Sequence, residues 1–209
     1  MKLESKNLTE GKPIPSKHAF CVLTPEGKVE MGLNKNPDFS WSNLPETTKS
    51  LTLICHDSEV PTSAENVNKE GKVVSKNLAR TDFFHWVLYD IPVEIDGIKE
   101  GEFSNGITAR GKNSKDAPHG TKQGLNNYTE WFKGDENMEG EYYGYDGPCP
   151  PWNDERIHKY HFTLYALDVP HLLVPSRTVN GADVLRALYE HILASSSITV
   201  TYTLNKDLV

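Results

Sequence analysis

Four stretches of the chain alternate apolar and polar side chains with the two-residue period of a β-strand. They cover residues 51–55, 85–89, 160–166 and 198–204. In the last stretch the apolar positions alternate with threonines, which is typical of a half-buried strand. Each stretch is long enough to cross a sheet, so the pattern predicts strands at all four places.

One segment near the C-terminus has the spacing of an amphipathic helix instead. Asp183 lies in its first turn, where a carboxylate is favourable. Its apolar positions are spaced i, i+1, i+4, i+8 and i+9, and they are Val184, Leu185, Leu188, Ile192 and Leu193. Aromatic residues at i, i+3 and i+4 predict a second, shorter helix around residues 127–133.

Many strands, few helices and no regular alternation of the two predict an all-β fold, a sandwich or Greek-key barrel with peripheral helices. A chain of 209 residues can bury a complete core, so we expect a single domain spanning residues 1–209. The polar stretches 62–80 and 104–122 lack the composition for a core of their own and are expected to be surface loops or insertions.

The charge balance restricts the partners of this domain. The 29 acidic and 22 basic residues give a net charge of -7, which repels nucleic acid and anionic membrane surfaces. An anionic ligand would therefore need a pocket of local donors rather than a charged patch. No stretch approaches the roughly 18 apolar residues of a membrane-spanning helix, so membrane insertion is not expected.

The cysteines and the N-terminal residues indicate a compartment. Cys21, Cys55 and Cys149 are far apart, and an odd number cannot close into a full set of disulfides, which favours a reducing environment. The first residues do not resemble a signal peptide. We therefore expect a cytoplasmic protein.

Three polar residues share the inward parity of the predicted strands. Asp57 continues the face of residues 51–55, His85 begins the face of residues 85–89, and His158 begins the face of residues 160–166. Buried polar groups are costly unless they are paired, so one arrangement brings all three together. A protonated imidazole there would donate N–H bonds to phosphate or carboxylate, more strongly as the pH falls. On spacing alone, a structural role for each histidine at a strand end is about equally favoured.

Three motifs surround these residues. The first is His56-Asp57-Ser58-Glu59-Val60-Pro61 and the second is Phe84-His85-Trp86-Val87-Leu88-Tyr89-Asp90-Ile91-Pro92. The third runs from Gly144 to Pro151 and is followed by His158-Lys159-Tyr160-His161-Phe162. In this order they resemble the signature of the phosphatidylethanolamine-binding protein family, also called Raf-kinase-inhibitor-like, in its bacterial branch. The similarity extends from about Gly32 to Leu204.

The resemblance implies a β-sandwich with a small pocket for phosphate, phosphoethanolamine or a carboxylate, and a homodimer. It implies no cofactor, no metal and no catalysis. Carried over position by position, the ligand-binding residues are Asp57, Pro61, His85, Pro150, Pro151, His158 and Tyr160.

Some positions depart from the family pattern. Ser58 stands where proline is usual and Glu59 where a second aspartate is usual, so we expect a less rigid loop beside Asp57. Lys159 replaces the usual arginine and cannot form a bidentate pair. The acidic stretch 152–157 lies next to the pocket and is expected to oppose a doubly charged phosphate.

Three functions remain open at this stage. The first is a binding protein for a small anion, regulating a kinase, a protease or another partner. The second is a mononuclear metalloenzyme, because two histidines and one carboxylate on strands form the ligand set of iron oxygenases. The third is an inhibitor of a protease or kinase that acts through an exposed loop, for which residues 62–80 are the candidate.

Overall fold

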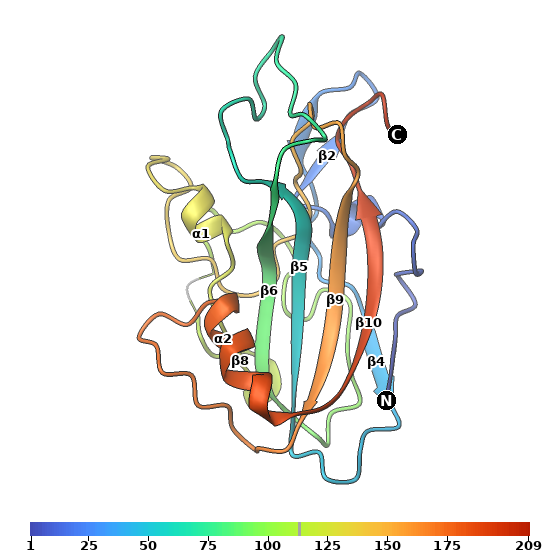
Figure 1. Cartoon of the computed structure of the whole chain (residues 1–209), viewed down its shortest axis with the longest axis vertical. Coiled ribbons are helices and arrows are strands. Elements are labelled where there is room, and N and C mark those ends of the chain that lie inside the picture. Colours follow the sequence, from blue (N-terminus) through green and yellow to red (C-terminus); the bar gives the residue numbers. More distant parts are fainter. Residues whose placement is uncertain (113) are drawn as a thin grey trace.

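The computed structural model describes residues 1–112 and 114–209, and a five-stranded antiparallel sheet dominates it (Figure 1). The order across this sheet is β10-β9-β5-β6-β8. The strands are β5 (Ser50–Pro61), β6 (Arg80–Pro92), β8 (Lys122–Gln123), β9 (His158–Leu167) and β10 (Ile192–Tyr202). The strands predicted at residues 51–55, 85–89 and 160–166 are parts of β5, β6 and β9, while 198–204 overlaps the end of β10.

The connections of this sheet follow the Greek-key rule. Within this sheet, strands β5, β6 and β8 lie side by side in chain order, and β9 then returns beside β5 instead of β8. The spatial order of these four strands is therefore fourth, first, second, third. The return places β9 next to β5, so that residues from three segments of the chain meet at one end of the sheet.

A smaller sheet packs against one face of the large sheet and makes the molecule a sandwich. It consists of β1 (Lys2–Glu4), β4 (Phe39–Ser42) and β7 (Gly97–Ile98). Phe39 and Trp41 of β4 are buried against side chains of the large sheet that include Leu53 and Phe162. A two-stranded ribbon of β2 (Cys21–Leu23) and β3 (Val29–Met31) stands apart from both sheets. The predicted all-β sandwich is confirmed.

Helices lie at the periphery, as expected. Figure 1 shows α2 (Gly181–Leu188) against β6, where Val184 and Leu188 pack on the face of the large sheet opposite the sandwich core. A capping box between Asn180 and Asp183 starts α2. The other helices are α1 (Tyr128–Trp131) and the 3₁₀ turns η1 (Ser16–His18), η2 (Pro118–Gly120) and η3 (Tyr189–His191). Among the described residues no helix has the length and apolarity needed to cross a bilayer.

The predicted C-terminal helix was too long. Helix α2 ends at Leu188, and after η3 the chain enters β10 at Ile192, which pairs with Leu167 of β9. Ile192 and Leu193 fit a helical period in the sequence, but they belong to the strand. Ladder hydrogen bonds with β9 outweigh local helical preference there, as tertiary context commonly does.

The cysteine interpretation also needs correction. Cys21 of β2 and Cys149 form a disulfide across 128 residues of sequence, and Cys55 is a buried free thiol. Three scattered cysteines can therefore still yield one bridge and one core residue. The cysteine count no longer favours a reducing compartment.

The close approach of α2 to β6 generates a prediction. A Cβ atom at Gly181 would lie 2.3 Å from the ring of Phe84, which is far inside van der Waals contact. Gly181→Ala should therefore lower the free energy of unfolding by about 1–3 kcal/mol through overpacking. The exposed neighbour Ala182 is the control, and Ala182→Ser should change stability by less than about 0.5 kcal/mol. Equal urea midpoints for the two variants would contradict this packing.

Candidate functional site

The residues predicted for the pocket line one cavity of about 60 Å³ at one end of the large sheet. They are Asp57 and Pro61 of β5, His85 of β6, His158 and Tyr160 of β9, and Pro150 and Pro151 of the segment before β9. The sequence did not single out the rest of the wall, which is Val60, Ala64, Val67, Asn68, Phe83, Tyr128, Trp131 and Cys149. Pockets for drug-sized ligands exceed roughly 300 Å³, so this cavity suits a group of only a few atoms.

His85 reaches the pocket by a route that the sequence pattern does not predict. Trp86 faces Cys55 across the strand pair, yet Phe84 faces His56, so β6 has one extra residue at His85. This β-bulge reverses the parity of the strand beyond it. The expected shared face was therefore wrong: Val87 packs under α2 on the opposite face, while the ring of His85 lies 5.2 Å from that of Tyr160.

A second bulge shapes β5 beside Asp57. Asp57 pairs with Phe83 and Val60 with Thr81, so β5 has an extra residue between these pairs. Oδ1 of Asp57 accepts the N–H of Glu59 at 2.8 Å within the bulge. One oxygen of the carboxylate is thus held by its own strand, in addition to the contacts with distant residues described next.

Asp57 begins a chain of buried charges. Nδ1 of His158 lies 2.7 Å from Oδ2 of Asp57, and Nε2 of His158 lies 3.2 Å from Oδ2 of Asp154. The two guanidinium nitrogens Nη1 and Nη2 of Arg80 contact the Asp154 carboxylate at 2.6 and 3.0 Å. At most 6% of any of these four side chains is exposed. Each charge has an opposite partner, as buried charges require.

The protonation of His158 follows from its two carboxylate neighbours. Burial alone would lower its pKa, but the bonds to Asp154 and Asp57 raise the pKa of His158 to about 9. Burial likewise opposes the charge of Asp154, yet the bonds from His158 and Arg80 hold the pKa of Asp154 below its ordinary value. His158 is therefore an imidazolium at neutral pH, with both N–H groups bound to carboxylates.

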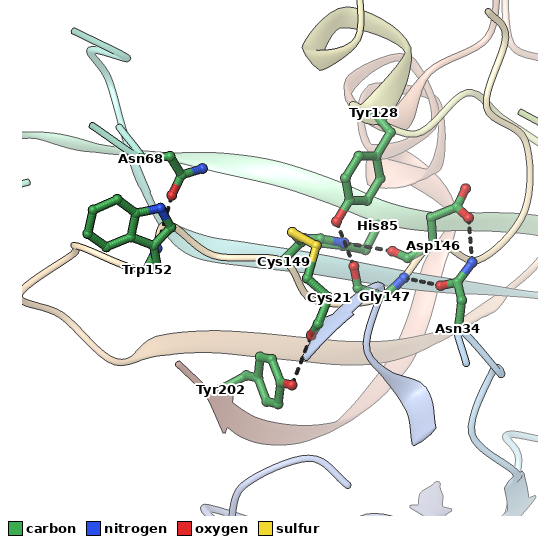
Figure 2. The surroundings of a disulfide bond; sticks show 10 residues. All are labelled: Cys21, Asn34, Asn68, His85, Tyr128, Asp146, Gly147, Cys149, Trp152 and Tyr202. Carbon is green, nitrogen blue, oxygen red and sulfur yellow. Dashed lines mark hydrogen bonds between the residues drawn. A yellow bond between two sulfur atoms is a disulfide. The ribbon is translucent and has the colours of Figure 1, made fainter. Parts of the chain in front are cut away.

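His85 has the opposite character. Its Nδ1 lies 2.7 Å from the main-chain oxygen of Asp146, which can only accept, so Nδ1 carries a hydrogen (Figure 2). Burial lowers the pKa of His85 to about 4, and the charge of Asp57 opposes this only in part. The imidazole is neutral at pH 7, and its Nε2 is then an acceptor. The expected imidazolium donor is thus absent at neutral pH: the charged histidine has no free N–H, and the other is uncharged.

The hydroxyl of Tyr160 is the remaining polar group of note in the cavity. It is buried and has no hydrogen-bond partner among the described residues. An unmet buried hydroxyl costs about 1–3 kcal/mol, which a ligand could recover. Tyr160 and Asp57 are direct cross-strand partners, so this hydroxyl and the carboxylate face the same space.

A buried carboxylate orders the loop that orients His85. The side chain of Asp146 accepts from Asn34 at 2.8 Å, from Lys112 at 2.8 Å and from Asn126 at 2.9 Å. Burial raises the pKa of Asp146, and these three donors oppose that rise. No local sequence pattern marks this cluster, because its members come from distant segments.

The stretch 62–80 was expected to be a surface insertion, but part of it forms the pocket wall. Val74 is fully buried, and Ala64, Val67 and Asn68 line the cavity. The Asn153 side chain fixes this stretch by donating to the main-chain oxygens of residues 66, 69 and 72 and accepting from the N–H of residue 68. Arg80, at the end of the stretch, supplies the last charge of the buried chain.

The acidic residues near the pocket are largely neutralised. Asp154 is paired as described, and Glu59 lies 2.8 Å from Arg156 and 3.6 Å from Lys159. The expectation that residues 152–157 oppose an anion is therefore weakened. The substitution of lysine for arginine at 159 leaves the pair with Glu59 in place, with Arg156 as a second cation.

The donor arrangement does not favour the metalloenzyme alternative. A histidine ligates a metal through a neutral nitrogen, whereas both nitrogens of His158 face carboxylates. No group of three or more histidine, cysteine, aspartate or glutamate side chains in the described part of the chain has the geometry to hold a metal ion.

Comparisons with known proteins give a consistent result. The family model described as phosphatidylethanolamine-binding protein matches residues 4–203. The UPF0098 protein YbhB of Escherichia coli (strain K12) is 29% identical over 203 residues, covering 97% of this chain and 100% of YbhB. The UPF0098 protein of Methanothermobacter thermautotrophicus is 30% identical over 171 residues, covering 82% of this chain and 84% of that relative.

Two solved structures are similar over nearly their whole length. CT736 of Chlamydia trachomatis, described as a homologue of phosphatidylethanolamine-binding protein, has a TM-score of 0.61 and 27% identity, with 96% of this chain and 95% of that chain covered. Escherichia coli YbcL has a TM-score of 0.67 and 24% identity, with 97% of both chains covered. The latter supports the fold alone.

The buried chain of charges predicts a pH dependence of stability. The pKa of His158 is about 9 in the folded protein against 6.5 ordinarily. Its contribution, on the order of 3 kcal/mol, should be complete below about pH 6.5 and lost as the pH rises to about 9. Urea denaturation between about pH 6 and 9.5 measures it.

A variant of Asp154 makes this assignment specific. Asp154→Asn removes one of the two carboxylates and should move the loss of stability to lower pH. Asp168→Asn is the matched control, because Asp168 pairs with the surface His191 at 2.9 Å. Identical profiles for the wild type and Asp154→Asn would show that Asp154 does not raise the pKa of His158.

Proposed function

Because the chain belongs to the phosphatidylethanolamine-binding protein family, we propose that it is a binding protein whose pocket takes a small oxyanion together with a proton. The ligand is the phosphoryl or carboxylate end of a larger molecule, since the cavity has room for the head group alone. The observation that carries this proposal is the buried Tyr160 hydroxyl, which has no hydrogen-bond partner among the described residues and lies in the same cavity as the neutral His85.

The charges of the pocket explain why the ligand brings a proton. Asp57, His158, Asp154 and Arg80 sum to zero, so they offer no net attraction to an anion. Neutral His85 presents an acceptor at Nε2, which repels an oxyanion until it is protonated. Protonation turns Nε2 into a charged donor, and charge-assisted bonds to oxyanions are among the strongest in proteins.

Regulation of a kinase, a protease or another protein partner stays a prediction of the family resemblance. So does the homodimer. Light scattering at high micromolar concentration tests the homodimer, and a monomer mass there would contradict it.

Proton-linked binding predicts a pH profile below the ordinary histidine range. A bound anion raises the pKa of His85 above its value of about 4 in the empty pocket, so binding takes up a proton. Affinity should rise up to about tenfold for each pH unit below 7 and level off near pH 4. Sulfate is the probe for calorimetry, because it keeps its charge over this range.

Variants of two histidines test which group takes up the proton. His85→Asn keeps a donor for the Asp146 carbonyl but removes Nε2, and it should lower sulfate affinity by about tenfold to a hundredfold at pH 5. His56→Asn is the control, because His56 stacks on His161, outside the residues that line the pocket. Affinity that is independent of pH, or equal in the two variants, would overturn the proposal.

The hydroxyl of Tyr160 gives a prediction that separates binding from structure. Tyr160→Phe removes a buried hydroxyl that has no partner among the described residues, so the free energy of unfolding should stay equal or rise. The same change should weaken methyl phosphate binding by about threefold to tenfold. A variant that is destabilised yet binds normally would show that the hydroxyl serves the fold instead.

A further inference from the structure

The segment Cys149–Pro151 forms one wall of the pocket. All three of its residues line the cavity, together with Asp57 of β5 and His85 of β6. The position of this wall sets the shape of a cavity of only about 60 Å³. A small displacement of the wall therefore changes which ligands fit into the cavity.

The chain on either side of this wall is firmly hydrogen bonded. Before it, the main-chain oxygen of Pro148 accepts from the N–H groups of Phe20 at 2.9 Å and Cys21 at 3.1 Å. After it, the N–H of Trp152 donates to the side chain of Asn68 at 3.0 Å (Figure 2). Both anchors involve atoms outside the wall itself.

The wall itself has almost no such bonds. Pro150 and Pro151 have no N–H to donate. Within the described part of the chain, the one hydrogen bond to the backbone of residues 149–151 is a local turn from the N–H of Asp154 to the oxygen of Pro151, at 3.2 Å. Apart from packing, the disulfide is the tie that joins this wall to a distant element.

The two ends of the disulfide differ in how they are held. Cys21 is buried in β2, and its main-chain oxygen accepts from the Tyr202 hydroxyl at 2.9 Å (Figure 2). Cys149 is partly exposed, and neither its N–H nor its main-chain oxygen has a hydrogen-bond partner among the described residues. Cys21 is thus the fixed end, and Cys149 is the end that moves when the bridge is broken.

We propose that the Cys21–Cys149 disulfide is a redox-controlled latch on the ligand pocket, opened by a dithiol reductant. A thiolate of the reductant attacks Sγ of Cys149, the more exposed of the two residues, and Cys21 leaves as a thiolate that takes up a proton. The second thiol of the reductant then attacks the mixed disulfide, which releases Cys149 as a thiol and the reductant as its own disulfide. Two electrons and two hydrogens pass to the protein.

Reduction should act locally, because the surrounding anchors do not depend on the bridge. The two bonds to Pro148, the Asp146 cluster and the main sandwich core remain in place. The wall is then held by packing alone and spends part of its time away from the cavity. If one-tenth of the reduced molecules keep the wall closed, ligand affinity falls about tenfold.

The latch rests on the proposed function for its effect on binding, but its motion is measurable without ligand. Hydrogen exchange of the Asp154 amide, which donates to the main-chain oxygen of Pro151 at 3.2 Å, should be at least several-fold faster after treatment with dithiothreitol. The amide of Gly124, bonded to Val87 at 2.9 Å and outside the pocket lining, is the internal reference and should not change. Unchanged exchange at Asp154 would overturn the latch, whether or not the protein binds a ligand.

Binding of methyl phosphate then tests control of the pocket. The oxidised protein should bind about tenfold more tightly than the reduced protein. The double variant Cys21→Ser/Cys149→Ser should bind like the reduced protein and should not respond to dithiothreitol. Cys55 is present in both proteins, so an effect of the dithiol on Cys55 would appear in both.

The outcomes separate the two proposals. Equal affinity of the oxidised and reduced proteins would overturn redox control while leaving the anion pocket intact. An oxidised protein that binds neither methyl phosphate nor sulfate would overturn the proposed function, and ligand control with it. Hydrogen exchange would then still show whether reduction of the disulfide frees the wall to move.

Discussion

The contact of His158 with two carboxylates is the interaction on which the rest of the site depends. It joins Asp57 on β5 to Asp154 in the segment before β9, and Arg80 at the start of β6 completes the chain of charges. Taking four charges out of water costs several kcal/mol for each ion, so such a chain persists only when every charge is paired. Three segments of the chain are thereby fixed around one end of the sheet.

The same pairing determines what the pocket offers to a ligand. Because His158 uses both of its N–H groups on carboxylates, the cavity presents a neutral His85 and an unpaired Tyr160 hydroxyl instead of a fixed positive charge. Such a site suits an oxyanion that arrives with a proton. It also works in a protein with a net charge of -7, because the attraction arises only inside the pocket.

Local patterns in the sequence predicted those parts of the site that follow strand period. Asp57, His158 and Tyr160 share a face because β5 and β9 are regular there. The parity of His85 was wrong, since a bulge adds one residue to β6 and no local pattern marks it. The pocket residue itself was still found, because the family motif includes it.

Contacts between distant segments could not be predicted from the sequence. Arg80 reaches Asp154 across 74 residues, and Cys21 reaches Cys149 across 128. Ile192 and Leu193 fit a helical period, yet the pairing of Ile192 and Ala194 with β9 makes them part of a strand. In each case the local structure is decided by an interaction with a residue far along the chain.

The protonation states of the two pocket histidines are the central claim, and nitrogen-15 NMR of the imidazole side chains measures them directly. In the ligand-free protein, both nitrogens of His158 should carry hydrogens up to about pH 8, since its pKa is about 9. His85 should carry hydrogen at Nδ1 alone down to about pH 5, since its pKa is about 4. A His158 that loses its proton near the ordinary histidine pKa, or a His85 that is cationic at pH 7, would contradict the account.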